Sequence, residues 1–198
     1  STEAYAAGRT SIDNPLNAMW STAIFEIAHD GSGGGEVVWE WHLWDHLVQD
    51  ADSGDDNYGV VADHPELFDI NCGNVGGSGG PGGATADWMH INAISYNADF
   101  DQIVLSSRFQ CEIFVIDHST TTEEAAGHDG GNFGNGGDFL YRWGNPQNYD
   151  RGNNSDNLIC EQHGVNWIPN GYPGGGNFIL FNISNLMILI SQFNKLDR

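Results

Sequence analysis

At 198 residues, the chain fits one domain or part of a larger one. It carries 27 acidic residues against 6 basic ones, and this net charge of −21 opposes binding to nucleic acid or to anionic membranes. No apolar stretch is long enough to cross a bilayer, so we expect no membrane insertion. The 27 glycines and 7 tryptophans favour a β protein rich in turns.

The three cysteines are Cys72, Cys111 and Cys160. Their odd number and the absence of a C-x-x-C pair indicate neither a zinc knuckle nor a disulfide framework. We therefore expect three small, buried side chains with free thiols.

An internal repeat organises the chain. "AIFEIAHD" (23–30) matches "EIFVIDHS" (112–119), and "GEVVWEW" (35–41) matches "GDFLYRW" (137–143). The two offsets are 89 and 102, so the second copy holds a connecting loop that is longer by 13 residues. Short segments rich in Val, Ile, Phe and Trp, bounded by Gly, Asp or Asn, predict antiparallel strands.

The predicted strands lie at about 22–29, 36–43, 88–97, 101–108, 111–117 and 137–143. The last four follow one another directly, and four successive antiparallel strands are typical of a β-propeller blade. The segment 163–182 resembles the opening of such a blade, with His163 aligned on His90. The Gly- and Asp-rich segment 49–87 is expected to be a solvated loop, because its "DADSGDDN" lacks the spacing of a calcium loop.

We therefore expect an all-β fold, a single partial β-propeller domain over 1–198 with about two blades' worth of strands. Its predicted parts are the end of one blade (20–48), the loop 49–87, a complete blade (88–143), a loop with the start of the next blade (144–182) and a divergent tail (183–198). Because propellers close with roughly 4–8 blades, we expect a fragment of a longer, six-bladed protein. The tail is either foreign sequence or a divergent strand.

The candidate functional residues gather at blade openings. His90 and Asn92 are expected on one strand at i and i+2, hence on the same face. His163 takes the place of His90 in the next blade, Arg108 ends the neighbouring strand, and His46 follows the preceding blade in "WDHL". The sequence thus predicts a cluster of these five residues without a carboxylate.

Histidines joined by an arginine and an asparagine, without acids, indicate an anion site rather than a metal site. A tetrahedral oxyanion such as sulfate or phosphate fits these donors. Arg108 would act locally, because salt screens charges beyond about 8–10 Å. Alternatively, Arg108 forms an ion pair with Glu112 or Asp101. We expect no metal and no cofactor.

The other five histidines have plainer interpretations. His29 and His118 recur at one position of the repeat and are predicted to form turns. His42, His64 and His128 are expected at the surface or in loops.

Several longer segments carry a resemblance to a known family. They are "GEVVWEWHLWDHL", "DWMHINAISYNADFDQIVLSSR", "IFVIDHSTTTEEAAGH", "LYRWGNP" and "QHGVNWIPNGYPGGGNFILF". Together they resemble the arylsulfotransferase (aryl-sulfate sulfotransferase) family over about 20–182. The resemblance implies a six-bladed β-propeller that moves a sulfuryl group from an aryl sulfate donor to a phenol acceptor, without a nucleotide sulfate donor.

Carried over by motif, the resemblance implies that His163 is a nucleophile forming a sulfohistidine in a ping-pong mechanism. His90, Asn92 and Arg108 would bind the sulfuryl oxygens and support proton transfer, and His46 would be the remaining active-site histidine. It also implies a periplasmic or secreted location, although no signal peptide is visible in the chain. The oligomeric state is not predicted.

Three alternatives stay open. A non-catalytic propeller module would bind anionic or aromatic ligands without turnover. A metal-dependent hydrolase would combine histidines with Asp45 or Asp87 and would lose activity to chelators. An inactive fragment would do neither. Trp88 and Trp167 could stack on an aryl ring, although packing roles suit them better.

Overall fold

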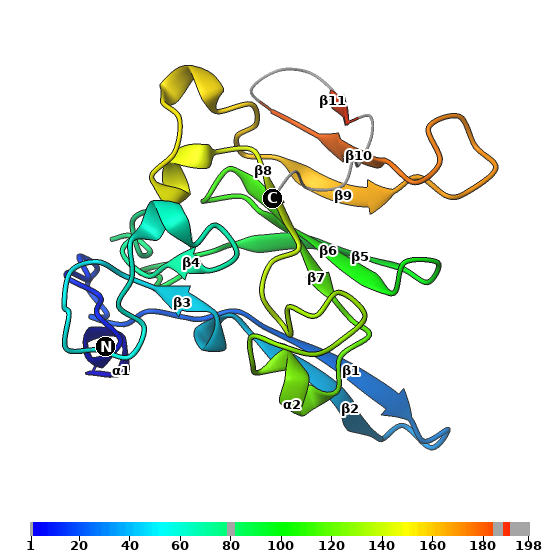
Figure 1. The fold of residues 1–198 in the computed structure, drawn as a ribbon, viewed down its shortest axis with the longest axis horizontal. Helices are drawn as coiled ribbons and strands as arrows, with labels where there is room; N and C mark the ends of the chain where they lie inside the picture. The colour runs from blue at the N-terminus through cyan, green and yellow to red at the C-terminus, as the bar shows by residue number, and fades with distance from the viewer. Residues whose placement is uncertain (1, 79–81, 184–187, 191–198) are drawn as a thin grey trace.

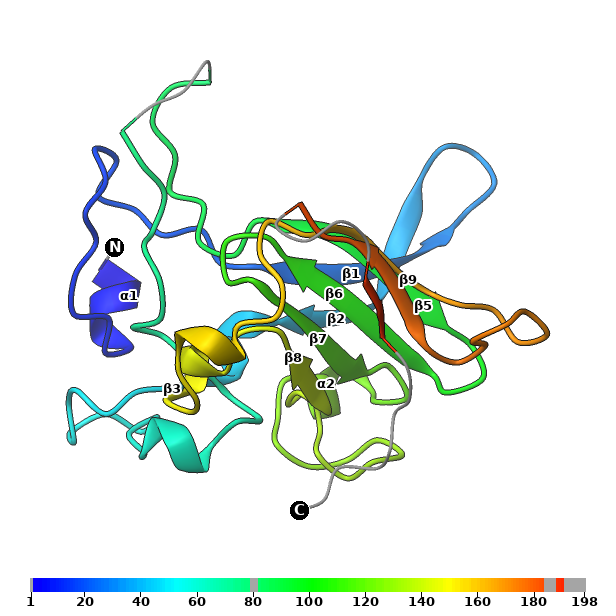
Figure 2. The same ribbon diagram turned by 90° about the horizontal axis from the view of Figure 1, so that it is seen from above.

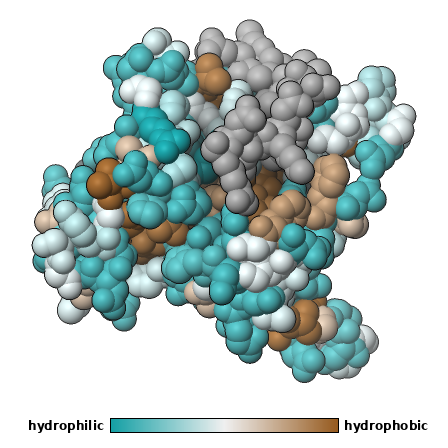
Figure 3. Space-filling view, viewed as in Figure 1, coloured by the Kyte–Doolittle hydropathy of each residue, from teal (hydrophilic) through white to brown (hydrophobic). Residues whose placement is uncertain are grey.

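The computed structural model describes residues 2–78, 82–183 and 188–190. The chain is built mostly of strands with a few short helices (Figure 1), so the all-β prediction is confirmed. Among the described residues, no helix has the length and apolar character needed to cross a membrane. Figure 3 shows a mostly hydrophilic face with separate hydrophobic areas, as the acidic composition predicts.

The strands are β1 (Ala23–His29), β2 (Gly35–His42), β3 (Leu47–Val48), β4 (Phe68–Asp69), β5 (Ile91–Asn97), β6 (Gln102–Ser107), β7 (Glu112–Asp117), β8 (Tyr141–Trp143), β9 (His163–Trp167), β10 (Phe178–Phe181) and β11 (Ile188–Ile190). The helices are α1 (Thr2–Ala6), α2 (Thr122–Ala125) and the 3-10 helices η1 (Leu43–Asp45), η2 (Val61–Asp63), η3 (Pro146–Tyr149) and η4 (Asn154–Asp156).

The strands form four sheets. The central sheet has the order β5-β6-β7-β8 and is antiparallel throughout, as expected for 88–143. β1 pairs with β2, β11-β10-β9 form a third sheet, and β3 and β4 form a short parallel pair. Figure 2 shows the β1–β2 hairpin extending away from the central sheet. Within the described residues, the sheets do not close into a barrel or a propeller.

The strand registers agree with the internal repeat. Ile24 pairs with Trp41 across β1 and β2, and the matching Ile113 pairs with Trp143 across β7 and β8. The same two sequence patterns therefore form the same antiparallel pair twice. The longer loop of the second copy carries α2.

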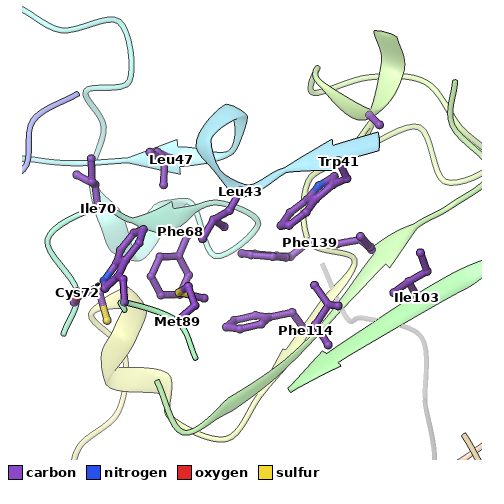
Figure 4. Close-up of a cluster of buried hydrophobic side chains, with 14 of the residues drawn as sticks. Trp41, Leu43, Leu47, Phe68, Ile70, Cys72, Met89, Ile103, Phe114 and Phe139 are labelled. Atoms are coloured by element: carbon purple, nitrogen blue, oxygen red, sulfur yellow. Dashed lines mark hydrogen bonds between the residues drawn. The ribbon is translucent and has the colours of Figure 1, made fainter. Parts of the chain in front are cut away.

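The central sheet is buried on both faces. All residues of β6 and β7 are buried, and alternate side chains enter two separate cores. Leu105 and Phe114 join the first core, which reaches β2 and β4 (Figure 4), whereas Val104 and Val115 join the second, which reaches β9 and β10. Because successive side chains of a strand point to opposite faces, the central sheet packs against a different neighbour on each face.

The expectation that 49–87 is only a solvated loop is wrong. This segment contains η2 and β4, and it buries Val61, Phe68 and Ile70 completely or almost completely. Its acidic part, 50–57, is mostly exposed, as expected. Apolar residues that follow this acidic part complete the first core, so the segment belongs to the folded unit.

The predicted tail, 183–198, lies mostly outside the described residues. Within it, the backbone of β11 pairs with β10. This pairing agrees with the divergent-strand alternative for that short stretch.

The expectation of three free thiols is wrong for two of them. Cys111 and Cys160 form a disulfide across 49 residues of chain, whereas Cys72 is buried and free. Burial raises the pKa of the Cys72 thiol above its ordinary value. Three cysteines are equally consistent with one disulfide and one free thiol, so their odd number did not exclude a disulfide. Only the packing of β9 beside the central sheet brings the turn before β7 to the loop before β9.

The disulfide leads to a stability prediction. Replacing Cys160 with Ser should lower the free energy of unfolding by about 4 kcal/mol, because the bond closes a long loop in the unfolded chain. Urea denaturation under oxidising conditions measures the difference. Repeating it with reductant provides the control, since reduction should remove the difference. Equal stabilities under oxidising conditions would contradict the prediction.

A pH dependence follows from Asp69 in β4. Burial raises the pKa of its carboxyl to about 6, against about 4 in an unfolded chain. Between these values the folded state holds a proton that the unfolded state lacks, so stability falls as the pH rises through this window. Asp69→Asn keeps an oxygen that can accept from the Asn71 N–H. Its melting temperature should exceed that of the wild type increasingly from pH 4 to pH 7, and a constant difference would refute this explanation.

Candidate functional site

The structure brings four of the five predicted residues to the junction of β5, β6 and β9. The Arg108 N–H donates to the His90 carbonyl at 3.1 Å where β6 leaves β5. The Asn92 side-chain Nδ2 donates to the Gln162 carbonyl at 2.7 Å. Asn92 therefore contacts the residue directly before His163, which opens β9.

His90 reaches this junction by a different route from the predicted one. It lies just before β5, in a left-handed conformation with φ of 48°, and the pairing of β5 with β6 shifts between Ile91 and Ala93. Strand alternation therefore does not set the relative directions of His90 and Asn92. Instead, Asp87 holds His90 by accepting from its backbone N–H at 2.9 Å and by bonding to its Nδ1.

The bonding partners assign the hydrogens of both histidines. His163 Nδ1 lies 2.9 Å from the Glu161 carbonyl oxygen, and a carbonyl can only accept, so Nδ1 carries the hydrogen. An Nδ1–H of His90 likewise donates to the Asp87 carboxylate. In the neutral rings, each Nε2 then carries a lone pair available to a substrate.

Arg108 forms an ion pair with Glu161, with 2.7 Å between Nη2 and Oε1. The predicted alternatives, Glu112 and Asp101, are wrong. Glu112 instead pairs with Arg142, and Asp101 bonds to His118.

The expectation of a cluster without carboxylates is also wrong, since Asp87 and Glu161 both belong to it. Asp87 lies only three residues before His90, so the sequence could have suggested that this carboxylate belongs to the cluster. Glu161 is 53 residues from Arg108 along the chain, and only the packing of β9 on β5 brings them together.

Two residues of the site have strained backbones. His90 and Glu161 have φ values of 48° and 53°, in the left-handed region that favours glycine. Such conformations cost about 1–3 kcal/mol each and gather at functional sites. His90 lies directly before β5, and Glu161 lies two residues before β9.

Sequence reasoning missed the role of Gln162. This residue is fully buried, and its Nε2 donates to the carbonyls of Ser107 and Glu112 at 2.8 and 2.9 Å. It thereby fastens the segment before His163 to β6 and β7. Two buried acceptors at this place, Gln162 Oε1 and Asn92 Oδ1, have no hydrogen-bond partner among the described residues.

His46 lies apart from the other four in its bonding. It is fully buried, with Nδ1 2.8 Å from Asp138 Oδ1 and Nε2 2.9 Å from the Ala125 carbonyl oxygen. Its ring stacks on Trp41. Within the described residues it shares no hydrogen bond with His90, and its catalytic role stays a prediction.

The remaining aromatic and histidine predictions have mixed outcomes. Trp88 is fully buried and donates to the Cys72 carbonyl, so it packs rather than stacks on a ligand. Trp167 is mostly buried against Phe178. His29 Nδ1 accepts from the Gly31 N–H and so forms the predicted turn.

His118 lies in the bend directly after β7, as predicted, and its side chain also makes long-range contacts. His118 lies between Asp101 and Glu26, with 2.8 Å from Nδ1 to Asp101 Oδ1 and 3.1 Å from Nε2 to Glu26 Oε2. These contacts join β1 to the turn before β6. His42, His64 and His128 have side chains that are 40%, 43% and 61% exposed, as a surface placement requires.

The junction of β5, β6 and β9 thus holds two imidazoles, a guanidinium and an amide on an all-β scaffold. The family model described as arylsulfotransferase (ASST) matches residues 24–185. The chain therefore belongs to the arylsulfotransferase family, and membership supports a sulfotransferase-type function on small aryl molecules. Neither the curated proteins nor the solved structures contain a match.

The ion pair at Arg108 leads to a binding prediction. Replacing Glu161 with Gln should free the guanidinium, and sulfate should bind up to about fivefold tighter, since an exposed pair contributes at most about 1 kcal/mol. Calorimetric titration with sulfate at constant ionic strength measures the change. Glu123→Gln, which removes an exposed carboxylate in α2, is the matched control. Weaker or unchanged binding in Glu161→Gln would contradict a competing role for Glu161.

Proposed function

We propose that this chain acts as an aryl-sulfate sulfotransferase. It moves a sulfuryl group from an aryl sulfate ester to a phenol through a sulfohistidine at His163. The observation that carries the proposal is the 2.9 Å contact between His163 Nδ1 and the Glu161 carbonyl, which leaves Nε2 as the nucleophilic atom. Family membership over residues 24–185 supports the same reaction.

In the first half-reaction, His163 Nε2 attacks sulfur while the S–O bond to the aryl oxygen breaks. The electron pair leaves on the phenolate, and protonated His90 Nε2 donates its proton to that oxygen. In the second half-reaction, neutral His90 takes the proton of the acceptor phenol, whose oxygen then attacks sulfur. The N–S bond breaks, and its electron pair returns to His163 Nε2. The Asp87 carboxylate holds the His90 ring and stabilises its charged form.

The transferred group has three oxygens that develop charge in the transition state. Arg108 supplies a permanent positive charge beside these oxygens, and to contact them it must leave its ion pair with Glu161. Asn92 uses one of its two amide hydrogens for the Gln162 carbonyl and keeps the other for a sulfuryl oxygen.

The proposed scaffold is a β-propeller. The central sheet β5–β8 would be one blade, β9–β11 the start of the next, and β1–β2 the end of the preceding one. The repeated registers of Ile24–Trp41 and Ile113–Trp143 support equivalent blades, as does the packing of β9 beside β5. The disulfide supports the proposed periplasmic or secreted location, because such bonds persist in oxidising compartments.

The test is intact mass after incubation with a chromogenic aryl sulfate at mildly alkaline pH. The wild type should gain one sulfuryl group, and His163→Ala should gain none. His64→Ala removes a partly exposed histidine that bonds to Glu66, and it is the matched control that should gain the group. Binding of the ester without a mass gain in the wild type would indicate the alternative, a non-catalytic binding module.

A further inference from the structure

A second group of polar side chains lies outside the sulfuryl-transfer site. Asp138 Oδ1 is 2.8 Å from Nδ1 of His46 and 2.8 Å from Nδ1 of His128. One ligand atom from each of the three residues lies within 4.8 Å of the other two. His46 comes from the turn between β2 and β3, whereas His128 and Asp138 come from the connection between β7 and β8, so the group joins two distant parts of the chain.

The donors and acceptors around His46 favour a cation. Its Nε2 faces the Ala125 carbonyl oxygen at 2.9 Å and must carry a hydrogen, because a carbonyl only accepts. In the neutral ring, the Nδ1 lone pair then points at the Asp138 carboxylate, which is also an acceptor. A metal ion between them would turn this repulsion into two coordination bonds. A backbone carbonyl that accepts the second N–H is the usual support of a metal-bound histidine.

The two buried ligands are held in place before any ion binds. The His46 ring is fully buried and lies parallel to Trp41, with 4° between the ring planes. The Asp138 side chain is only 8% exposed. Glycine at 137 permits this close packing, because a Cβ there would lie 2.1 Å from the Ala125 oxygen and 2.6 Å from His46 Nε2.

His128 provides the accessible side of the group. Its side chain is 61% exposed, and it borders a cavity of about 340 Å³ that Asp45, Asp56 and His64 also line. The carboxylates of this cavity and the net charge of −21 attract cations to it. The cavity is therefore an entry route for an ion.

We propose that His46, His128 and Asp138 bind one transition-metal ion of the Zn²⁺ type, with water as a fourth ligand. Two imidazole nitrogens select such an ion over Mg²⁺ or Ca²⁺, which prefer oxygen ligands. Metal–ligand bonds of about 2.0–2.2 Å require neighbouring ligand atoms to separate to about 3.3 Å. The His46 and Asp138 atoms, now 2.8 Å apart, must therefore move apart by about 0.5 Å, and exposed His128 must shift by a similar amount. The mechanism proposed above draws on His163, His90, Asn92 and Arg108 and does not require this ion.

The experiment is Zn²⁺ titration by calorimetry of the chain freed of metal by a chelator, together with thermal denaturation. The wild type should bind one Zn²⁺ per chain and melt at a higher temperature with Zn²⁺ than without it. His128→Ala should weaken binding at least tenfold, and circular dichroism checks that this exposed substitution leaves the fold intact. Asp138→Asn should weaken binding in the same way.

His64→Ala is the matched control, because His64 lines the same cavity but does not contact Asp138. Its affinity for Zn²⁺ should equal that of the wild type. Three outcomes would overturn the proposal: no binding of Zn²⁺ by the wild type, equal losses in His64→Ala and His128→Ala, or Mg²⁺ binding as tight as Zn²⁺ binding.

Discussion

The buried ion pair between Glu112 and Arg142 links the parts of the molecule on which the site depends. Its side chains are 0% and 3% exposed, and Arg142 Nη2 lies 2.8 Å from Glu112 Oε2. Burial raises the pKa of Glu112, while the charge of Arg142 and the bond from Asn148 oppose this rise. Arg142 also donates to the Leu67 carbonyl, and the Glu112 carbonyl accepts from Gln162. One pair thus fixes β7, the segment 49–87 and the residues that precede His163.

Each arginine in the described part of this acidic chain makes a contact with a residue far away in the sequence. Buried Arg9 donates to the carbonyls of Ile70 and Gly73, and Arg151 donates to the Ala62 carbonyl. Arg108 bonds across 53 residues to Glu161. A guanidinium offers five donors, so a few such residues can satisfy many carbonyl oxygens of irregular segments. Within the described residues, these guanidinium groups hold irregular segments to the rest of the fold.

Local pattern predicted the strands well, because alternation and turn residues act over a few neighbours. The repeat even anticipated the equivalent pairs Ile24–Trp41 and Ile113–Trp143. The partners of the site residues were harder to predict, because Glu161 meets Arg108, and Cys160 meets Cys111, only after β9 packs beside β5. The left-handed backbone of His90 was not predicted from the local sequence pattern either, because it accompanies the hydrogen bonds to Asp87.

Under the proposed function, the left-handed backbone of His90 sets stability against activity. Glycine there would relieve the backbone and remove the proposed proton-transfer side chain at once. Selection for heat resistance alone would therefore reward a change that removes a residue of the proposed mechanism. Engineering for robustness is better directed at sites such as Asp69, where the destabilising group lies outside the sulfuryl-transfer residues.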